Sequence, residues 1–433
     1  MIEKIRLLGP LLMMLICYNS CGQEKVEVWK VGIDVSEDTI SYGPVFGEPA
    51  QGVLVVKEDV DLMNLKCCLP KSVTLSFQGG VIKNGTLVGN ETKIDCHGAC
   101  FERVRILGTW DVPEISTSMF KDLDYDNSLK DVVALASPKV KNRIVIEKGN
   151  YQVSAANNRD VCIPVCGNTE LIIEGTIRLV PNDFENYEII QVKGNEVEIK
   201  GGGTIIGDKH NHTGETGEWG MGIDLKRARN VSISGLTIKD CWGDCIYVGG
   251  KSTNVIIENC LLDNGRRQGV SITSADDVTI RECKITNVEG TAPEYAIDVE
   301  PNKGNVVDHV TIDRVTVRDC KGGFLVLGNA KDARVGNVSI SRCDVSADRK
   351  IALKIYKCDT VIIENCKIKQ GVGSRVLVCK NVGYVSLKDN KITYNKVMSK
   401  IEGLVRKAVG RKEAKVIDLS NCGSTVVEGK GIQ

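Results

Sequence analysis

The sequence predicts an all-β solenoid, a parallel β-helix with three short strands in each coil. One segment of alternating β-branched residues recurs seven times, starting at positions 230, 254, 277, 309, 337, 360 and 384. The successive starts differ by 24, 23, 32, 28, 23 and 24 residues, so the copies keep one phase. Each copy holds a kinked pair of strands and a third short strand, which cannot bury their apolar faces alone and must stack on their neighbours.

The first element is an expected export signal at residues 1–20. Lys4 and Arg6 precede an apolar run at 7–17, which is shorter than the roughly 20 residues that a membrane-spanning helix needs. The segment resembles a bacterial lipoprotein signal, with Cys21 as the residue that would carry the lipid. We therefore expect an exported protein, anchored to a membrane facing the periplasm or the cell surface. An ordinary cleaved signal, with Cys21 incidental and the protein secreted, is the alternative.

The next elements lead into the solenoid. Residues 21–118 contain short apolar strands and turns and are expected to form a small β-rich lead-in. Residues 119–142 form a capping segment, with a short helix that begins at Asn127 or Ser128. The β-helix proper is expected at 143–394. Residues 395–433, which begin with a stretch rich in lysine and arginine, are expected to cap the other end and protect its strand edges.

The repeat also explains the cysteines within it. Cys260, Cys283, Cys343 and Cys366 occupy the same position of their copies, directly after the polar kink. Alternation points all four inward, which predicts a column of buried thiols spaced by about 4.8 Å per coil. We therefore expect few disulfides. The four histidines are scattered, and no metal site is predicted.

One outward face of the coils concentrates polar residues. In the third strand of each copy, alternation directs one side chain outward and a second one two residues later. Across the stacked coils these two positions form two outward columns of side chains. The first column is Asp224, Tyr247, Ser271, Asp298, Leu325 and Lys354, and the second is Lys226, Gly249, Thr273, Glu300, Leu327 and Tyr356. The preceding outward positions, two residues before the first column, are small and are expected to let a ligand approach. They are Gly222, Cys245, Gly269, Ala296 and Gly323.

Two insertions fall beside this face. The copies carry 11 extra residues near 207–220 and 9 near 286–295. Long loops on one side of a solenoid usually carry function. His210, His212 and Glu218 are expected to overhang the face, and the indole rings of Trp219 and Trp242 to stack on sugar rings.

The candidate catalytic residues are Asp244, Arg267, Asp298 and Glu300. Asp298 and Glu300 are two residues apart on one strand, so their carboxylates lie ~7 Å apart and suit acid and base work on a glycosidic bond. They could equally hold Ca²⁺, or be a solvated acidic strand; Asp244 could be a turn cap and Arg267 part of a surface charge cluster. The expected substrate-binding residues are Trp219, Asp224, Trp242, Tyr247, Arg266 and Gln268.

Several segments resemble the pectin-lyase-like superfamily of right-handed parallel β-helix proteins, including bacterial polysaccharide-active and phage tailspike-like members. The resembling segments are 120–154, 201–223, 240–250, 263–272 and 290–302. The resemblance implies a right-handed helix that handles polysaccharide, but it specifies no reaction. The motifs typical of polygalacturonases fit poorly, because Gly243 and Met221 stand where that family has aspartates and no histidine lies near Gln268.

Composition narrows the partners. The chain of 433 residues has 56 Lys and Arg against 56 Asp and Glu, which argues against a nucleic-acid binder. We expect a protein that cleaves or modifies a polysaccharide, and the expected substrate is a uronate-containing glycan. A polysaccharide lyase is favoured over a glycoside hydrolase. A lyase would use Arg267 and Asp244 near the uronate. A non-catalytic glycan-binding or surface-structural protein is the third possibility. The sequence predicts neither the oligomeric state nor a cofactor other than a possible Ca²⁺.

Overall fold

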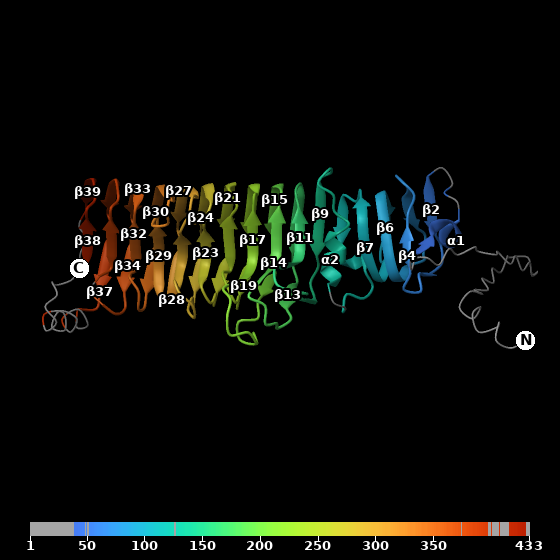
Figure 1. Cartoon of the computed structure of the whole chain (residues 1–433), viewed down its shortest axis with the longest axis horizontal. Helices are drawn as coiled ribbons and strands as arrows, with labels where there is room; N and C mark the ends of the chain where they lie inside the picture. The colour runs from blue at the N-terminus through green and yellow to red at the C-terminus, as the bar shows by residue number, and fades with distance from the viewer. Residues whose placement is uncertain are drawn as a thin grey trace, which may run out of the picture.

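Three long parallel β-sheets run side by side along the molecule and wind into a right-handed β-helix (Figure 1). The computed structural model describes residues 39–47, 49, 52–124, 127–373, 375–396, 400, 407 and 415–429. The expected signal segment 1–20 and Cys21 lie outside these residues. The chain visits the three sheets in turn, so each coil contributes one strand to each sheet, as the repeat predicts.

Sheet I and sheet II have ten strands each. Sheet I consists of β10 (Asn150–Val153), β13 (Thr176–Leu179), β16 (Thr204–Ile206), β19 (Thr237–Lys239), β22 (Leu261–Asp263), β25 (Lys284–Thr286), β28 (Thr316–Cys320), β31 (Asp344–Ala347), β34 (Lys367–Gln370) and β37 (Lys391–Tyr394). Sheet II consists of β11 (Asp160–Cys166), β14 (Asn186–Lys193), β17 (Trp219–Lys226), β20 (Ile246–Gly249), β23 (Gln268–Ile272), β26 (Tyr295–Val299), β29 (Gly322–Leu327), β32 (Leu353–Tyr356), β35 (Leu377–Lys380) and β38 (Ile417–Ser420).

Sheet III has twelve strands. It consists of β8 (Glu114–Ser116), β9 (Asn142–Ile146), β12 (Thr169–Ile173), β15 (Asn195–Lys200), β18 (Arg229–Ser234), β21 (Ser252–Glu258), β24 (Ala275–Arg281), β27 (Val306–Asp313), β30 (Arg334–Ser341), β33 (Cys358–Glu364), β36 (Tyr384–Lys388) and β39 (Ser424–Glu428). Strands β38 and β39, from the segment expected to cap the C-terminal end, extend sheets II and III by parallel pairing.

The lead-in is itself made of parallel strands. It contains β1 (Thr39–Ser41), α1 (Tyr42–Phe46), β2 (Val53–Val56), β3 (Val60–Asp61), β4 (Lys66–Cys68), β5 (Thr74–Phe77), β6 (Ile82–Asp95) and β7 (Phe101–Trp110). β6 pairs with β7 over most of its length, and a 3₁₀ turn (Thr117–Met119) and helix α2 (Ser128–Val133) follow β8. Asn127 is the N-cap of α2, as the sequence predicts.

Helix α2 joins the lead-in to the solenoid. Asp131 is buried, and its Oδ1 accepts a hydrogen bond of 3.0 Å from the backbone N–H of Ile106 on β7. Its Oδ2 lies 3.5 Å from the guanidinium of Arg105. One helical carboxylate thus ties the helix to the last strand of the lead-in.

The core consists of rows of apolar side chains that stack in register from coil to coil. On sheet II the side chains of Ile190, Ile223, Ile246, Val270 and Ile297 stand in one register row, all fully buried. Burying one such side chain contributes about 1.5–3 kcal/mol. A slip of one residue would turn each row toward solvent, so the apolar pattern sets the register of every coil.

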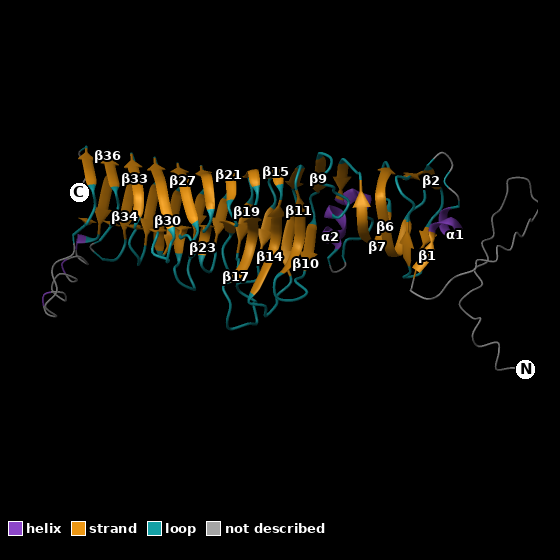
Figure 2. Cartoon of the chain, turned by 45° about the horizontal axis from the view of Figure 1, so that its top comes forward, coloured by secondary structure: helices purple, strands orange, loops and turns teal. Residues whose placement is uncertain are grey.

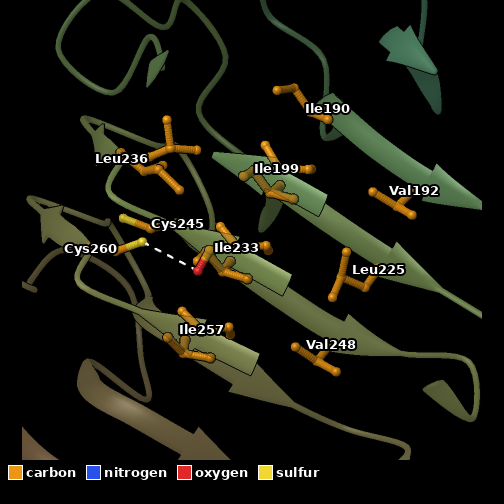
Figure 3. Packing of buried hydrophobic residues seen from close by; sticks show 14 of the residues in the cluster. Ile190, Val192, Ile199, Leu225, Ile233, Leu236, Cys245, Val248, Ile257 and Cys260 are labelled. Carbon is orange, nitrogen blue, oxygen red and sulfur yellow. Dashed lines mark hydrogen bonds between the residues drawn. The ribbon is translucent and has the colours of Figure 1, made fainter. Parts of the chain in front are cut away.

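The thiol column is confirmed. Cys260, Cys283, Cys343 and Cys366 are buried free thiols, and each Sγ lies against a backbone carbonyl of the preceding coil; the Cys260 contact to Ile233, 3.8 Å, is drawn in Figure 3. The neighbouring thiol and burial raise the pKa of Cys283 far above its ordinary value. The described residues contain one disulfide, Cys96–Cys100, in the lead-in.

The corner between sheets I and II carries the long loops. The loop after β16 spans 207–218 and the loop after β25 spans 287–294, close to the two insertions that the repeat spacing predicts. In Figure 2, long loops beside β14 and β17 protrude from the regular outline of the solenoid. Among the described residues, no helix is long and apolar enough to cross a membrane.

Candidate functional site

A row of polar side chains follows the outer surface of sheet II. The strand register aligns Gln191, Asp224, Tyr247, Ser271 and Asp298 across β14, β17, β20, β23 and β26. The next position, on β29, is Leu325. The row that alternation predicts therefore exists, begins one strand earlier than expected, and ends where the side chain becomes apolar.

The small residues do not form the floor of this face, which corrects one expectation. A Cβ on Gly222 would lie 2.7 Å from the Ile238 side chain, and one on Gly269 would lie 2.5 Å from Ile285. Both glycines thus face the core side chains of sheet I, although the residues after them face inward too. Alternation breaks at this corner, where two successive residues point inward.

The break at the corner brings Asp244 and Gln268 onto the outer face. Asp244 lies two residues before β20, and its Oδ2 accepts a 2.6 Å hydrogen bond from Ser271 Oγ on the neighbouring strand. Gln268 opens β23, and its Nε2 donates to Asp298 Oδ2 at 3.0 Å. Both contacts run between adjacent coils, so the side chains of this corner interlock with the polar row.

Burial controls the charge of both aspartates. Asp244 is completely buried, and this raises its pKa to about 6, although Arg267 and the Ser271 hydroxyl act to lower it. Burial, together with the carboxylates of Glu300 and Asp244, raises the pKa of Asp298 well above its usual range. Burial therefore favours the protonated form of both carboxyls compared with an exposed aspartate.

The two aspartates lean toward one strand. Asp244 contacts Ser271, and Asp298 contacts Gln268, and both partners belong to β23, which lies between β20 and β26. β20 and β26 are ~10 Å apart, which is two strand spacings. The two carboxyls therefore both make contact with β23, one from each of its neighbours in the sheet.

Arg267 connects the two long loops above the aspartates. Its guanidinium lies 3.4 Å from the Glu218 carboxylate in the 207–218 loop. Its Nε donates at 3.4 Å to the carbonyl of Ala292 in the other loop. Because its charge lowers the pKa of both Asp244 and Asp298, Arg267 is the cation of this site.

Trp242 and Arg266 do not present free surfaces to a sugar, contrary to the expectation from sequence. The His212 ring stacks on Trp242 with centroids 3.9 Å apart, and the Arg266 guanidinium lies 3.7 Å from the same ring centroid. Arg266 also donates at 2.8 Å to the carbonyl of Gly217. The stack therefore anchors the 207–218 loop.

The expected overhang is only partly present. The His212 side chain is fully buried, held by Asp208 at 2.8 Å. Trp219, in contrast, is 46% exposed and keeps an indole face available for stacking. Tyr247 is half-buried, and its hydroxyl accepts a 2.6 Å hydrogen bond from Thr273.

A second polar cluster, which sequence reasoning missed in part, lies one coil earlier. Lys226 Nζ is 2.9 Å from both Glu188 Oε1 and Asp224 Oδ2, and Gln191 Nε2 donates to Asp224 Oδ2 at 2.7 Å. Burial raises the pKa of Glu188. Glu188 and Gln191 escaped notice because β14 precedes the clear copies of the repeat; counting back one coil from Asp224 would have reached Gln191.

Unpartnered buried oxygens mark this face. The described residues include ten buried side-chain nitrogen and oxygen atoms without a hydrogen-bond partner. Five of them lie here: Glu188 Oε2, Asp224 Oδ1, Asp244 Oδ1, Gln268 Oε1 and Asp298 Oδ1. Such atoms are rare in folded proteins and each costs about 1–3 kcal/mol, so their concentration on one face favours a functional role.

These oxygens can accept hydrogen bonds from the hydroxyl groups of a ligand. Within the described part of the chain, no group of three or more His, Cys, Asp or Glu side chains has the arrangement to hold a metal ion. The arrangement offers two buried carboxyls of raised pKa and one guanidinium, which suit proton transfer.

Comparison with protein families finds one match. The family described as "Right handed beta helix region" matches residues 140–307. Two relatives come from Bacillus subtilis strain 168: YclG is 31% identical over 45% of this chain, and the SPbeta prophage-derived YorA is 27% identical over 64%. The chain spans 38% and 53% of the length of these two relatives.

The similar solved structures have low sequence identity to this chain. The A-module of the mannuronan C-5 epimerase AlgE4 from Azotobacter vinelandii is 12% identical, with a TM-score of 0.46, covering 72% of this chain and 95% of its own. A tailspike protein of E. coli bacteriophage HK620, in complex with a pentasaccharide, is 12% identical with a TM-score of 0.46, covering 71% and 64%. An exopolygalacturonase from Thermotoga maritima is 13% identical with a TM-score of 0.39, covering 65% and 90%. At these identities the likeness concerns the fold.

Proposed function

We propose that this chain is a carbohydrate-active β-helix protein that hydrolyses glycosidic bonds, with Asp298 and Asp244 as its acid and base. The observation that carries the proposal is the pair of buried carboxyls that both contact β23 and both have a raised pKa. Buried carboxyls with raised pKa values are typical of groups that transfer protons in catalysis.

The proposed reaction assigns one role to each carboxyl. Asp298 donates its proton to the glycosidic oxygen as the carbon–oxygen bond breaks. Asp244 takes a proton from the attacking water, whose oxygen bonds to the anomeric carbon. Two carboxyls that leave room for a water, roughly 6.5–9.5 Å apart, favour a single displacement with inversion of configuration.

Hydrolysis is favoured over the elimination that the sequence suggested first. Elimination needs a base beside a uronate and a cation to stabilise the resulting charge. Here Arg267 already faces Glu218, and the site holds two further carboxyl groups in Asp298 and Glu300. A protein that only bound glycan would gain nothing from burying the Asp298 carboxyl, because burying a carboxyl is unfavourable.

Product analysis tests this function. Incubation with a panel of polysaccharides should release reducing ends without the ultraviolet absorbance of an unsaturated sugar. Asp298→Asn and Asp244→Asn should each lower kcat at least 100-fold, as expected for loss of a general acid or base. The matched control is Asp277→Asn, an exposed position on sheet III with a φ of 55°, which asparagine tolerates.

Three results would contradict the proposal. An unsaturated product would indicate elimination, and full activity in Asp298→Asn would place the site elsewhere. Glycan binding without any product, under conditions where the protein is folded, would indicate a binding protein.

A further inference from the structure

We propose that the outer surface of sheet II has a second sugar-binding site, formed by Glu188, Gln191, Asp224 and Lys226. The sugar unit bound there donates hydrogen bonds from its hydroxyl or amino groups and carries no acidic group. This inference rests on the proposed function, since it assigns the substrate class of the same face. We call these four residues the β14–β17 cluster.

The cluster is built from two adjacent strands. Glu188 and Gln191 lie on β14, and Asp224 and Lys226 lie on β17. Lys226 bridges the two carboxyl groups at 2.9 Å each, and Gln191 adds a third donor at 2.7 Å. Burial opposes the charge of Lys226, yet the carboxylates of Asp224 and Glu188 outweigh it and raise the pKa of Lys226.

The donors of the cluster do not satisfy its acceptors. Lys226 and Gln191 engage Glu188 Oε1 and Asp224 Oδ2, whereas no nitrogen donor reaches Glu188 Oε2 or Asp224 Oδ1, although both residues are nine-tenths buried or more. The two carboxyls adjoin each other, and burial together with Asp224 raises the pKa of Glu188. A bridge that served the fold alone would be expected to satisfy such groups, because a buried carboxyl oxygen without a donor is destabilising. Lys226 lies over the carboxyls with 43% of its side chain exposed, so it can swing aside for a ligand.

The free atoms select the chemistry of the ligand. Both are carboxyl oxygens, which only a donor can satisfy, and sugar hydroxyl and amino groups are donors. A uronate or a sulfated sugar brings further acceptors and a negative charge. It would meet two acidic side chains here and those of Glu218, Asp244, Asp298 and Glu300 further along, against Lys226 and Arg267. The face therefore disfavours the uronate expected from the sequence.

The position of the cluster fits a glycan that spans both sites. Asp224 lies on β17, and Asp244 lies two residues before β20, the next strand of the sheet, which is ~4.8 Å further along the axis. Tyr247 stands beside Asp224 in the register and is half-buried, so its ring can pack against the sugar between them. A sugar in the β14–β17 cluster would thus be a close neighbour of the sugar at the reacting carboxyls.

Calorimetric titration of the full chain tests the inference. The probes are neutral oligosaccharides of glucose, galactose and mannose, chitosan oligosaccharides, and oligogalacturonates. The unaltered protein should bind a neutral or an amino oligosaccharide, and the two arms identify which donor group is used. Glu188→Gln and Asp224→Asn should each weaken that binding at least 10-fold. Glu198→Gln, on the outside of sheet III, should leave it unchanged.

The outcomes separate the second site from the proposed function. Unchanged binding in Glu188→Gln and Asp224→Asn, or binding of oligogalacturonates alone, would overturn the second site and leave hydrolysis standing. No binding of any probe together with no hydrolysis would overturn both. Asp298→Asn should keep the affinity while losing turnover, which separates binding from reaction.

A second measurement covers variants that fail to fold. Hydrogen exchange of the unaltered protein, with and without the bound oligosaccharide, should show added protection in 186–193 and 219–226. Absence of protection there, with binding intact, would overturn the second site without any variant.

Discussion

Asp244 illustrates how one residue can connect burial to reactivity. Its pKa of about 6 places its loss of a proton inside the working range of most enzymes. If Asp244 is the base, kcat/KM should fall as the pH drops below about 6, because the free enzyme then protonates its base. Ser271→Ala removes a hydrogen bond that favours the carboxylate, so the acid limb of the pH profile should move to higher pH. A profile without an acid limb near this value would assign the base to another group.

The burial of Asp244 predicts that this residue lowers the free energy of unfolding at neutral pH although the proposed reaction needs it. A carboxyl whose pKa rises from 3.8 to about 6 on folding contributes its full share of stability below pH 3.8 and loses it as the pH rises to about 6. The loss is roughly 3 kcal/mol at 1.36 kcal/mol per pKa unit. Asp244→Asn should therefore show a higher Tm than the unaltered protein at pH 8 and little difference at pH 4, with activity lost. Differential scanning calorimetry at the two pH values measures this, and Asp277→Asn serves as the control.

Sequence reasoning placed individual residues well where alternation holds. Asp224, Tyr247 and Asp298 stand in one outward row, as predicted, and their roles remain proposals. The prediction that Trp242 stacks on a sugar ring was wrong, because the 207–218 loop packs on Trp242 and such packing leaves no periodic signal in the sequence. Sequence reasoning also missed the depth of the site, since the cover over Asp244 comes from loops whose conformation depends on contacts such as Arg266 with Gly217.

At the scale of elements, the thiol column makes a chemical prediction. Cys260, Cys283, Cys343 and Cys366 are buried, whereas Cys68 is exposed. A thiol reagent should modify Cys68 within minutes in the native protein and reach the column only after denaturation. Mass spectrometry of the labelled peptides checks this. Rapid labelling of the column in folded protein, or its recovery as disulfides, would contradict the packing.

The elements themselves could be predicted because the repeat keeps its phase over seven copies. The corner before sheet II could not, since two successive residues there point inward and no alternation rule allows for this. Gly269 shows why: its Cβ would meet Ile285, so the position accepts only a small residue for reasons of core packing. A small residue in a sequence does not reveal which side it faces.

At the scale of the molecule, the junction at α2 should control whether the lead-in and the solenoid unfold together. Asp131→Ala removes the acceptor of the Ile106 N–H and should lower the free energy of unfolding by about 2–3 kcal/mol. Because a solenoid couples only neighbouring coils, the lead-in should then unfold in a separate, earlier transition. Urea titration followed by circular dichroism measures both effects.

The control for this prediction is Asp122→Ala. Asp122 pairs with Arg103 in the same region, but on the surface, where an ion pair is worth about 0–1 kcal/mol. A single unshifted transition in Asp131→Ala would show that the junction does not depend on this carboxylate. The lead-in could not be foreseen as parallel sheet, since its strands, from β3 of two residues to β6 of fourteen, have no common length or spacing.

The free thiols of the column have a mechanical consequence. From β9 to β37 all cysteines are unpaired, so no disulfide cross-links one coil to the next. Apart from the continuous backbone, only hydrogen bonds and packing hold neighbouring coils together against tension along the axis. A molecule stretched by its two ends should yield one coil at a time from the loaded end. Each coil of about 23 residues would release ~80 Å of chain at 3.3–3.6 Å per residue. A glycan lying across several strands of sheet II would bridge those coils and should raise the force at which they part.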